Sequence, residues 1–475
     1  MGDSNKSGSR VLTTLAVMSW IATGCDSLSD DELWERTTWS GKPNLPAQAA
    51  QGQPVLYVRF NLPQLRAAET KRIEFPLPDG TSIIIVKTSG EYVGSRGFIW
   101  HGKVEGDEWS IATLSIRDDV LVGDVVMSDS RMYRIDQVDV GKQVIFQLEP
   151  SKFPSEAEPV EATEPEGEPA PEPEAESEGV TIGSIGAGAI APAWAQPQSC
   201  DEDKIEVLVV YTEAACAASF TGFSSNYCSA LARTSIEDKI QQAMGETNTI
   251  FASSDTTPRM TVIHVASAGS YTESTDLAKE LTRLKYVDGV EKSKTNELFA
   301  YLDDIHDLRN EYGADVVSLI TKPSGRFTDG SACGRAALMR VEAPWFEKEA
   351  FTVVPQDCMV GNFSFGHELG HLMGANHEGV DESVLDRIPG NRGFAKPDPS
   401  QVNVHPWRTV MAENNSSCTA AKPLVGCKRL PVFSNPTLDY FGDKMGTAKA
   451  NNSQVVESTA ETVVRFRSSL ACDNK

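Results

Sequence analysis

The stretch of sequence that decides the fold runs from residue 367 to residue 377 and reads HELGHLMGANH. On a helix, His367 and His371 are four positions apart, so both imidazoles project from one face and can share a metal ion. Glu368 lies about 100° further round the helix, too far away to be a ligand but well placed to meet a metal-bound water. The stretch therefore predicts a helix that carries two metal ligands with a carboxylate beside them.

A third histidine, His377, would lie roughly 15 Å beyond His367 if the helix continued, and it would point elsewhere. Gly374 resolves this, because glycine accepts the left-handed conformation that ends a helix and turns the chain back. Three neutral histidines leave one coordination position open, as in a catalytic zinc site and unlike a closed structural one. We therefore expect one catalytic Zn²⁺ per chain, held by His367, His371 and His377. The other histidines are not expected to bind this ion: His101, His264, His306 and His405.

The alternative interpretation of this stretch is an amphipathic core helix whose histidines are simply hydrogen-bonded. It is disfavoured because five fixed residues must co-occur, and because three of the seven histidines fall in this one segment. A bound zinc ion lowers the pKa of its water from about 16 toward 7 and polarises a carbonyl group. Glu368 would accept the proton of that water as the water attacks a peptide carbonyl. We accordingly expect a zinc-dependent endopeptidase that acts on protein or peptide substrates, with Glu368 as general base.

The stretch resembles the zinc-binding motif of the metzincin clan of peptidases, whose members also have a methionine turn beneath the metal. Residues 408–412, which read RTVMA, resemble that turn and place Met411 in it. Some metzincins have a tyrosine two residues later that touches the zinc, but here the position is Glu413, so no such tyrosine is expected. The wider resemblance, to the reprolysin (adamalysin) branch and its bacterial relatives, covers most of residues 200–475. It implies that substrate lies extended along an edge strand, for which the candidates are Ala336, Ala337 and Leu338.

Residues 200–475 are expected to form an α/β (α+β) metzincin-like catalytic domain with a twisted mixed sheet and a zinc-binding active-site helix. Hydrophobic periodicity predicts strands at 205–212, 259–266 and 315–320 and helices at 234–252 and 293–311. The active-site helix is expected to begin near Ser364, which would be its N-cap. The pocket that sets side-chain preference is expected to take its wall from residues between His377 and Met411.

Residues 25–150 are expected to form a small β-rich domain. Its strand-like runs are bounded by turn signals such as Ser89-Gly90 and lie at 55–60, 82–86 and 144–148. Residues 98–104 and the pair Phe153-Pro154 resemble the propeptides of bacterial reprolysin-like enzymes, which implies a zymogen. The alternative is an independent binding module.

Proline and glutamate alternate from residue 151 to about residue 178, and this tract accounts for much of the formal net charge of −24. A self-repelling tract without apolar residues is expected to be an extended, disordered spacer. Residues 179–199 change to glycine, alanine and proline, which suits a junction that is cut during activation. No basic patch is evident, so no nucleic-acid partner is expected. The predicted organisation is a signal peptide at 1–24, a propeptide-like domain at 25–150, a linker at 151–199 and a zinc metallopeptidase domain at 200–475.

The first 24 residues have the pattern of a lipoprotein-type signal peptide. Lys6 and Arg10 form a basic start, and the apolar run at 11–21 is too short to span a bilayer as a helix. Residues 22–25, ATGC, resemble a bacterial lipoprotein cleavage box, so Cys25 is expected to carry a lipid that anchors the protein to a membrane. The alternative is an ordinary secretory signal. Either leader predicts a protein of the bacterial cell envelope or the extracellular space.

The chain has nine cysteines, and all except Cys25 lie in the predicted zinc domain. An even number in an exported protein suggests disulfides, and eight cysteines allow 105 pairings. The favoured pairs, two by proximity and then two by exclusion, are Cys216–Cys228, Cys418–Cys427, Cys333–Cys358 and Cys200–Cys472. The alternative is a cytosolic protein with free thiols.

Two other functions are also compatible with the sequence. One is a non-catalytic, zinc-containing surface lipoprotein or adhesin with a metzincin fold, against which Glu368 argues because metal binding does not require it. The other is a zinc hydrolase that acts on a non-peptide amide.

Latency must also be explained for a precursor. Many metzincin precursors are silenced by a propeptide cysteine, but this chain has no cysteine between Asp26 and Ser199. The β-rich domain is therefore expected either to block the cleft with another group, such as a carboxylate or a backbone carbonyl, or only to assist folding.

Overall fold

The computed structural model describes residues 33–162, 204–222, 227–286, 302–326, 332–379, 388–400, 404–413, 418 and 426–467. The predicted signal segment with Cys25, the linker beyond residue 162, and the predicted pair of Cys200 and Cys472 lie outside the described residues. Within the described ranges, no helix has both the length and the apolar character that crossing a membrane requires.

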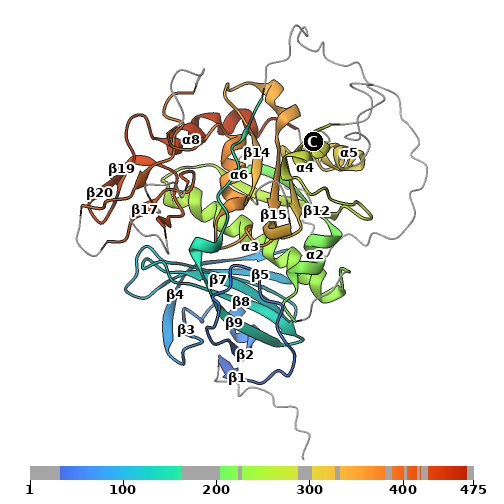
Figure 1. Cartoon of the computed structure of the whole chain (residues 1–475), viewed down its shortest axis with the longest axis vertical. Coiled ribbons are helices and arrows are strands. Elements are labelled where there is room, and N and C mark those ends of the chain that lie inside the picture. The colour runs from blue at the N-terminus through green and yellow to red at the C-terminus, as the bar shows by residue number, and fades with distance from the viewer. Residues whose placement is uncertain are drawn as a thin grey trace, which may run out of the picture.

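The N-terminal β region, residues 33–149, is a nine-stranded antiparallel sheet, blue to teal in Figure 1, with the order β1-β2-β9-β8-β7-β6-β5-β4-β3. A short helix, α1 (Leu62–Arg66), follows β2. The turn expected at Ser89-Gly90 is wrong, because β4 continues through both residues and the chain turns at Gly94 (φ +60°). The strands are β1 (Trp34–Arg36), β2 (Leu56–Phe60), β3 (Arg72–Pro76), β4 (Ser82–Val93), β5 (Gly97–Val104), β6 (Ile111–Arg117), β7 (Val120–Val126), β8 (Met132–Asp139) and β9 (Lys142–Leu148).

The two faces of this sheet differ in chemistry. In β6, Leu114 and Ile116 belong to a core formed by the N-terminal β region alone, whereas Ser115 and Arg117 alternate with them and are buried on the opposite face. That opposite face packs on the long helix α3 (Ala230–Ser253) of the second half of the chain. Every residue of β6 is therefore buried, although half of them are polar or small.

Buried polar groups join the N-terminal β region to α3. Lys239 Nζ donates to Asp136 Oδ2 at 2.9 Å, and Gln242 Nε2 donates to Asp124 Oδ2 at 2.8 Å. Apolar side chains on the same face, such as Phe146, share a hydrophobic cluster with α3. The contact between the two halves therefore combines apolar packing with buried ion pairs.

The second sheet is mixed, with the order β10-β14-β15-β13-β11-β12. Strands β15, β13, β11 and β12 run parallel, and β14 is antiparallel to β15. The three strands predicted in this half are confirmed to within one residue at each end. The bounds are β10 (Val160–Glu161), β11 (Lys204–Tyr211), β12 (Arg259–Ser267), β13 (Val316–Thr321), β14 (Arg335–Leu338) and β15 (Phe351–Pro355).

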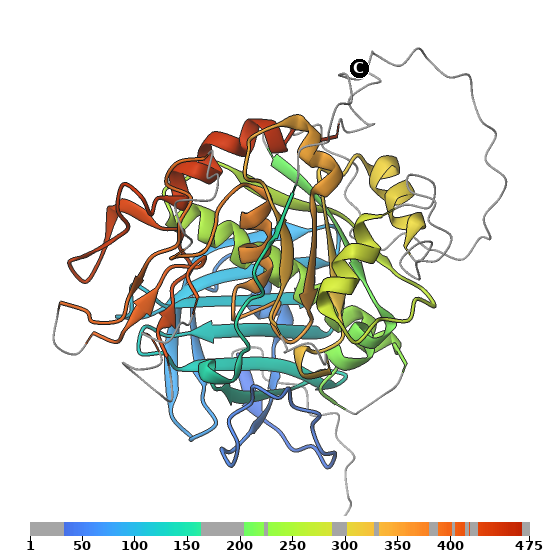
Figure 2. The ribbon, with the colours of Figure 1, turned by 45° about the horizontal axis from the view of Figure 1, so that its top comes forward.

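Helices cover both faces of the second sheet (Figure 2). In β11, Val207 and Val209 belong to one cluster with α3 and α6 (Ser364–Leu372), while Leu208 and Val210 belong to another with α4 and α5. Burial on both faces explains why β11 is almost continuously apolar. The described part of the helix predicted at 293–311 begins at residue 303. The other helices are α2 (Glu213–Ser219), α4 (Leu277–Lys285), α5 (Asp303–Tyr312) and α8 (Asn452–Val463).

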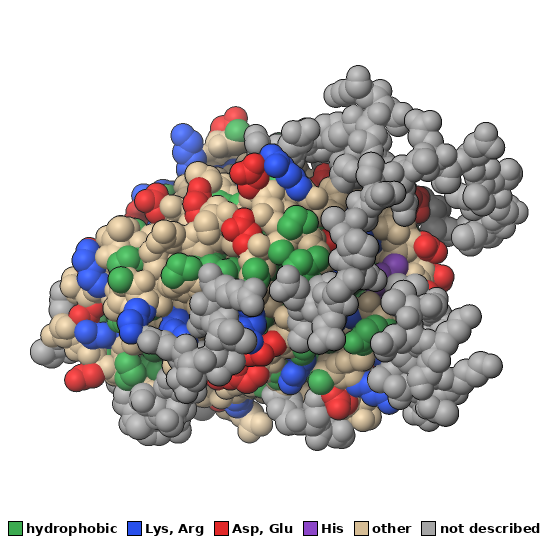
Figure 3. Space-filling model, turned by 90° about the horizontal axis from the view of Figure 1, so that it is seen from above, with side chains coloured by type: hydrophobic (Ala, Val, Ile, Leu, Met, Phe, Trp, Pro, Cys, Tyr) green, Lys and Arg blue, Asp and Glu red, His purple; other side chains and the backbone are tan. Residues whose placement is uncertain are grey.

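Short elements complete the C-terminal part, where α8 and two small sheets lie beside α6 (Figures 1 and 2). They are β16 (Ala395–Lys396), β17 (Trp407–Arg408), β18 (Lys428–Arg429), β19 (Asn435–Tyr440) and β20 (Asp443–Met445). In the described residues, short 3₁₀ helices are found at Pro150–Lys152, Ser324–Arg326 and Pro344–Glu349. On the upper face of the molecule, seen in Figure 3, acidic and basic side chains are interspersed around apolar ones.

The connecting segment, residues 150–162, leaves the N-terminal β region and runs past α6 to β14 (Figure 1). Cys333 N donates to Ser155 O at 3.0 Å, Ala157 N donates to Gly334 O at 3.1 Å, and β10 then pairs in parallel with β14. The disorder predicted from residue 151 is therefore wrong up to residue 162, because the backbone finds partners on the sheet. For the same reason β14, the predicted edge strand, is covered by β10.

Three of the predicted disulfides are present, and all lie in the second half of the chain. They are Cys216–Cys228, Cys333–Cys358 and Cys418–Cys427. The Cys333–Cys358 bond ties the loop before β14 to the segment that leads from β15 into α6, so it links two sides of the region described next.

Candidate metal centre and catalytic site

Helix α6 positions the predicted metal ligands. It begins at Ser364, and its N-cap is Phe363 in the left-handed conformation (φ 64°), so the expectation that Ser364 is the cap is off by one residue. After the helix, Gly374 has φ +87°, a conformation that glycine adopts without strain. The chain turns back there, and His377 lies beside the two histidines of the helix.

The three histidines converge on one point. His367 Nε2 lies 3.0 Å from His377 Nε2 and 3.1 Å from His371 Nε2, and the last two nitrogens are 3.1 Å apart. A tetrahedral zinc ion with Zn–N bonds of about 2.0–2.1 Å holds its nitrogens roughly 3.3 Å from one another. All three side chains are buried. The spacing therefore fits a small tetrahedral cation, and the residue types fit zinc.

Backbone carbonyls orient two of the rings. His367 Nδ1 lies 2.9 Å from Val410 O, and His371 Nδ1 lies 2.8 Å from Ala375 O. A ring that donates from Nδ1 presents the lone pair of Nε2, which is the form that binds a metal. Burial holds the pKa of both rings well below the ordinary value, which favours the neutral form. Three converging lone pairs repel one another unless a cation lies between them, so the donor set also fits a metal.

The outer side of His377 faces two carboxylates. Its Nδ1 lies 3.6 Å from Glu413 Oε1 and 3.7 Å from Glu158 Oε2 of the connecting segment. Burial, more than any neighbour, raises the pKa of Glu413. The position where some metzincins carry a tyrosine thus supplies an acid that faces the third histidine.

Glu368 is buried next to this cluster, and neither of its carboxylate oxygens has a hydrogen-bond partner among the described residues. Burial and then the charge of Glu156 raise its pKa well above the ordinary value. A Cβ atom on Gly334 would lie 2.3 Å from Glu368 Oε1, so glycine at that position leaves the room that the carboxylate occupies. An unpartnered buried carboxylate is costly, and it fits a group whose partner is a water or a substrate.

Met411 lies beneath α6. Ala412 N donates to Thr409 O at 3.1 Å and closes a tight turn around Met411. The sulfur lies 2.9 Å from the place of a Cβ on Gly370, so the turn packs directly against the helix. Sequence reasoning expected a turn at this position, and its support of the metal site stays a prediction.

Arg429, on β18, was not anticipated from the sequence. Its guanidinium is buried and donates to Val410 O from Nε at 2.9 Å and from Nη2 at 2.7 Å. Val410 O is the same carbonyl that orients His367, and Arg429 Nη2 lies 2.6 Å from the Nδ1 of that ring. The arginine therefore lies immediately behind the predicted zinc site. It follows Met411 in the chain, outside the range in which the pocket wall was expected.

The connecting segment brings acids of its own into this region. Arg429 Nη1 pairs with Glu156 Oε1 at 2.5 Å, and Ser364 Oγ donates to the same oxygen at 2.7 Å. Glu158, two residues further on, is the carboxylate that faces His377. A carboxylate was one of the groups that sequence reasoning allowed for blocking the cleft.

The other histidines are engaged elsewhere. His264 stacks on Tyr312 with ring centroids 3.9 Å apart, and His306 Nε2 lies 2.8 Å from Leu284 O. Within the described ranges, the groups of side chains able to hold a metal include neither these residues nor the remaining two histidines, His101 and His405.

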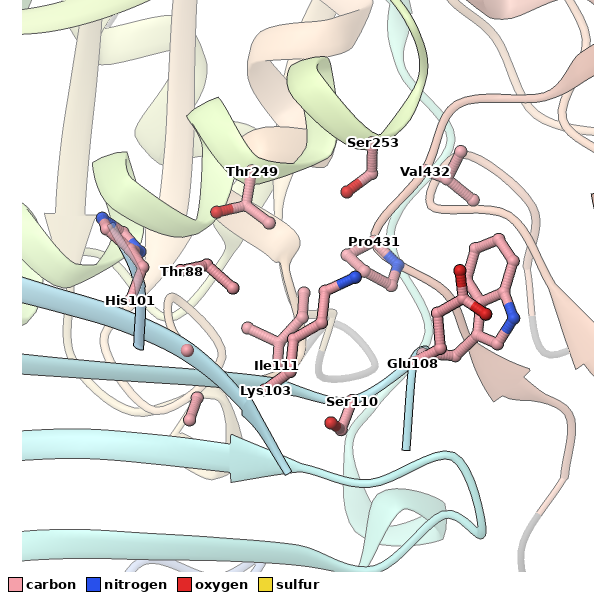
Figure 4. Close-up of a pocket in the computed structure, with 13 residues that line it drawn as sticks. Thr88, His101, Lys103, Glu108, Ser110, Ile111, Thr249, Ser253, Pro431 and Val432 are labelled. Carbon is pink, nitrogen blue, oxygen red and sulfur yellow. The ribbon is translucent and has the colours of Figure 1, made fainter. Parts of the chain in front are cut away.

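His101 instead lines a cavity of about 210 Å³ between the N-terminal β region and the second half of the chain (Figure 4). Lys103 of β5 and Thr249 of α3 face this cavity from opposite sides. Pro431 and Val432, which lie shortly after β18, also line it. The cavity is a feature of the contact between the two halves and is separate from the histidine cluster.

Comparison with known proteins gives one matching family. The model of Metallo-peptidase family M12 (Reprolysin_5) matches residues 201–422. A peptidyl-Asp metalloendopeptidase of Stenotrophomonas maltophilia (strain R551-3) is 28% identical over 415 residues, which are 84% of this chain and 84% of that protein. A protein with the same name from Pseudomonas fragi is 32% identical over 116 residues, which are 24% of this chain and 67% of that protein.

Among solved structures, metalloproteinase-II from Bacteroides fragilis matches with a TM-score of 0.30 and 11% identity, over 62% of this chain and 78% of that chain. A score this low carries no argument about the fold, so the assignment rests on the family model and the relatives. The chain belongs to metallopeptidase family M12 and is a zinc metalloendopeptidase.

Proposed function

We propose that this chain is the precursor of an exported endopeptidase in which His367, His371 and His377 hold one zinc ion and Glu368 is the general base. The observation that supports this most strongly is the convergence of three buried Nε2 atoms beside a buried carboxylate without a described hydrogen-bond partner. Zinc bound there would supply a Lewis acid and a water of lowered pKa.

The chain's own residues then have distinct tasks. Glu368 takes the proton of the attacking water and returns it to the leaving amine. The carbonyls of Val410 and Ala375 hold two imidazoles in the metal-binding tautomer. Met411 supports α6 from below, and Gly374 lets the chain bring His377 back to the site.

The substrate is proposed to lie along β14, with its backbone paired to the strand. The residues of β14 available for this are Ala336, Ala337 and Leu338. In the precursor, β10 takes this place, pairing Val160 with Ala337 and Glu161 with Leu338. A backbone that is already paired cannot accept a substrate, so the precursor should be less active than the form without residues 25–162.

The acids of the connecting segment replace the cysteine that silences many metzincin precursors. Glu158 reaches the third histidine and Glu156 reaches the arginine behind the first. The N-terminal β region holds this segment in place through an ion pair and a hydrogen bond with α3, and we propose that it is a propeptide.

Export and anchoring rest on residues 1–25, which lie outside the described residues. The basic start, the short apolar run and the cysteine after Gly24 support a lipoprotein signal, with Cys25 as the acylated residue and the bacterial cell envelope as its location. The relatives are named peptidyl-Asp metalloendopeptidases, and we propose protein substrates that this chain cleaves beside aspartate.

Casein hydrolysis tests the proposed activity. The full chain, with a specific protease site inserted between residues 179 and 199, is assayed before cutting and again after cutting and removal of the N-terminal fragment, with and without a zinc chelator. The product without that fragment is called the cut chain. We expect hydrolysis by the cut chain that the chelator abolishes and added zinc restores. A cut chain that binds one zinc per molecule but hydrolyses neither casein nor peptides would favour the non-catalytic surface protein.

A further inference from the structure

Arg429 is a buried cation whose geometry is fixed before any substrate arrives. Besides the two bonds to Val410 O, its Nη1 donates to Asn362 O at 2.8 Å. Bonds to backbone carbonyls hold the guanidinium in place, and in the precursor Glu156 is the acid that balances its positive charge. Because Nε and Nη2 both donate to Val410 O, Nη1 is the nitrogen that donates to a carboxylate, and such a charge-assisted hydrogen bond is stronger than a neutral one.

A second buried arginine, Arg408, adds to the positive charge near Arg429. Arg408 is buried, and burial followed by the nearby charge of Arg429 lowers its pKa to about 9. Glu156 is the acid that pairs with Arg429 directly, and it also acts favourably on Arg408. Once Glu156 departs with the connecting segment, two buried arginines remain with their closest acid removed. Such a site favours a new carboxylate strongly, because unpaired buried charge is unfavourable.

The main chain around Glu156 runs where a substrate would run. Ser155 O accepts from Cys333 N and Ala157 N donates to Gly334 O, so the residues on both sides of Glu156 are paired to the loop that enters β14. Gly334 is the residue that leaves room for Glu368. A substrate chain held here would pass Glu368 and direct one side chain toward Arg429, as the connecting segment does with Glu156.

We propose that Arg429 recognises an acidic side chain of the substrate next to the bond that is cut, and that Glu156 fills this position in the precursor. The inference rests on the proposed endopeptidase function and adds to it the residue that selects the substrate. Glu156 thus acts as an internal copy of the substrate side chain. One carboxylate oxygen of Glu156, Oε1, accepts hydrogen bonds from both Arg429 and Ser364. The other, Oε2, is buried without a hydrogen-bond partner among the described residues.

The first experiment measures kcat/KM of the cut chain for sets of matched peptides. Within each set the peptides have Asp, Asn or Ala at one position and are otherwise identical, and each set varies a different position. Loss of a charge-assisted hydrogen bond should reduce the ratio of kcat/KM for the Asp peptide to kcat/KM for the Asn peptide by about 10- to 100-fold in Arg429→Gln. Arg429→Lys should recover part of the preference for Asp. Arg259→Gln, which removes a cation that binds only backbone carbonyls near β12, is the control and should keep the wild-type preference.

Zinc content and thermal midpoint are measured on every variant, so that a misfolded protein is recognised. If Arg429→Gln does not fold, the preference of Arg429→Lys decides, because a weakened ratio of Asp to Asn cleavage is still expected there. Folded variants that retain the wild-type ratio would overturn the proposal. A wild-type chain that cleaves casein without any acidic preference would do the same. A wild-type chain without chelator-sensitive cleavage would instead refute the proposed function.

The second experiment uses a synthetic peptide with the sequence of residues 153–162 as an inhibitor of the cut chain. The peptide should inhibit, and its Glu156→Gln version should inhibit about 10- to 100-fold more weakly. The matched control peptide carries Glu161→Gln, because Glu161 is largely exposed and pairs with Arg340, away from Arg429. Equal inhibition by the Glu156→Gln and unchanged peptides would show that Glu156 does not occupy a recognition position.

Discussion

Glu246 of α3 lies buried at the contact with the N-terminal β region, and it should make the stability of the intact chain depend on pH. Gly361 N donates to its Oε2 at 2.9 Å, and Gln242 Nε2 donates to its Oε1 at 3.0 Å. Burial, and then the negative charge of Asp124, raise the pKa of Glu246 from 4.5 to about 8. The folded precursor therefore holds a proton that the unfolded chain releases at neutral pH.

The sign and size of the effect follow from this shift. Below pH 4.5 both states are protonated and Glu246 has no effect on the free energy of unfolding. Between pH 4.5 and about 8 the folded state is progressively disfavoured, by roughly 1.4 kcal/mol for each pH unit, so the penalty at pH 7 is about 3 kcal/mol. Glu246→Gln imitates the protonated acid and should remove this penalty.

Chemical denaturation of the intact chain at pH 4.5 and pH 7.5 measures the difference. Glu246→Gln should be more stable than wild type by about 4 kcal/mol at pH 7.5 and close to equal at pH 4.5. Asp439→Asn is the control, because its ion pair with Lys444 is half exposed and should matter by less than about 1 kcal/mol. A Glu246→Gln variant whose stability follows wild type at both pH values would refute the buried protonated acid.

Other predictions concern the metal, the cleft and the anchor. His371→Ala should lose zinc, as measured by metal analysis, and full zinc occupancy would contradict its role as a ligand. Gly334→Ala should retain zinc but lose roughly 10²-fold in kcat/KM on casein, because the new Cβ displaces Glu368, and unchanged activity would refute that contact. Cys25→Ser should move the protein from the membrane fraction to the soluble fraction in immunoblots; wild-type protein that is already soluble would support an ordinary signal peptide.

The local geometry of the histidine cluster could be predicted from the sequence because each feature depends on residues close together in the chain. The spacing of His367 and His371 on one helix, and the left-handed Gly374, follow from backbone geometry alone. The strands of the second sheet were predictable for a similar reason, since burial on both faces leaves an apolar run such as β11. Ser364 was misassigned as the N-cap because a left-handed phenylalanine before a helix has no sequence signal.

The contents of the cleft could not be predicted, since they depend on contacts between distant parts of the chain. Glu156 lies in a tract whose composition indicates disorder, and its partner Arg429 is 273 residues away. Arg429 itself follows Lys428 in what reads as an ordinary basic pair, and only the fold shows that it is buried behind His367.

The most direct test of the account compares the wild-type cut chain with Glu368→Ala in zinc content and in casein hydrolysis. Glu368 has no described partner to lose and lies outside the histidine group able to hold a metal, so the variant should keep one zinc per chain and a thermal midpoint no lower than that of wild type. Its kcat/KM should fall by about 10²–10⁴-fold, as expected when a general base is removed. Wild-type hydrolysis by a zinc-loaded Glu368→Ala chain would contradict the proposed catalytic site.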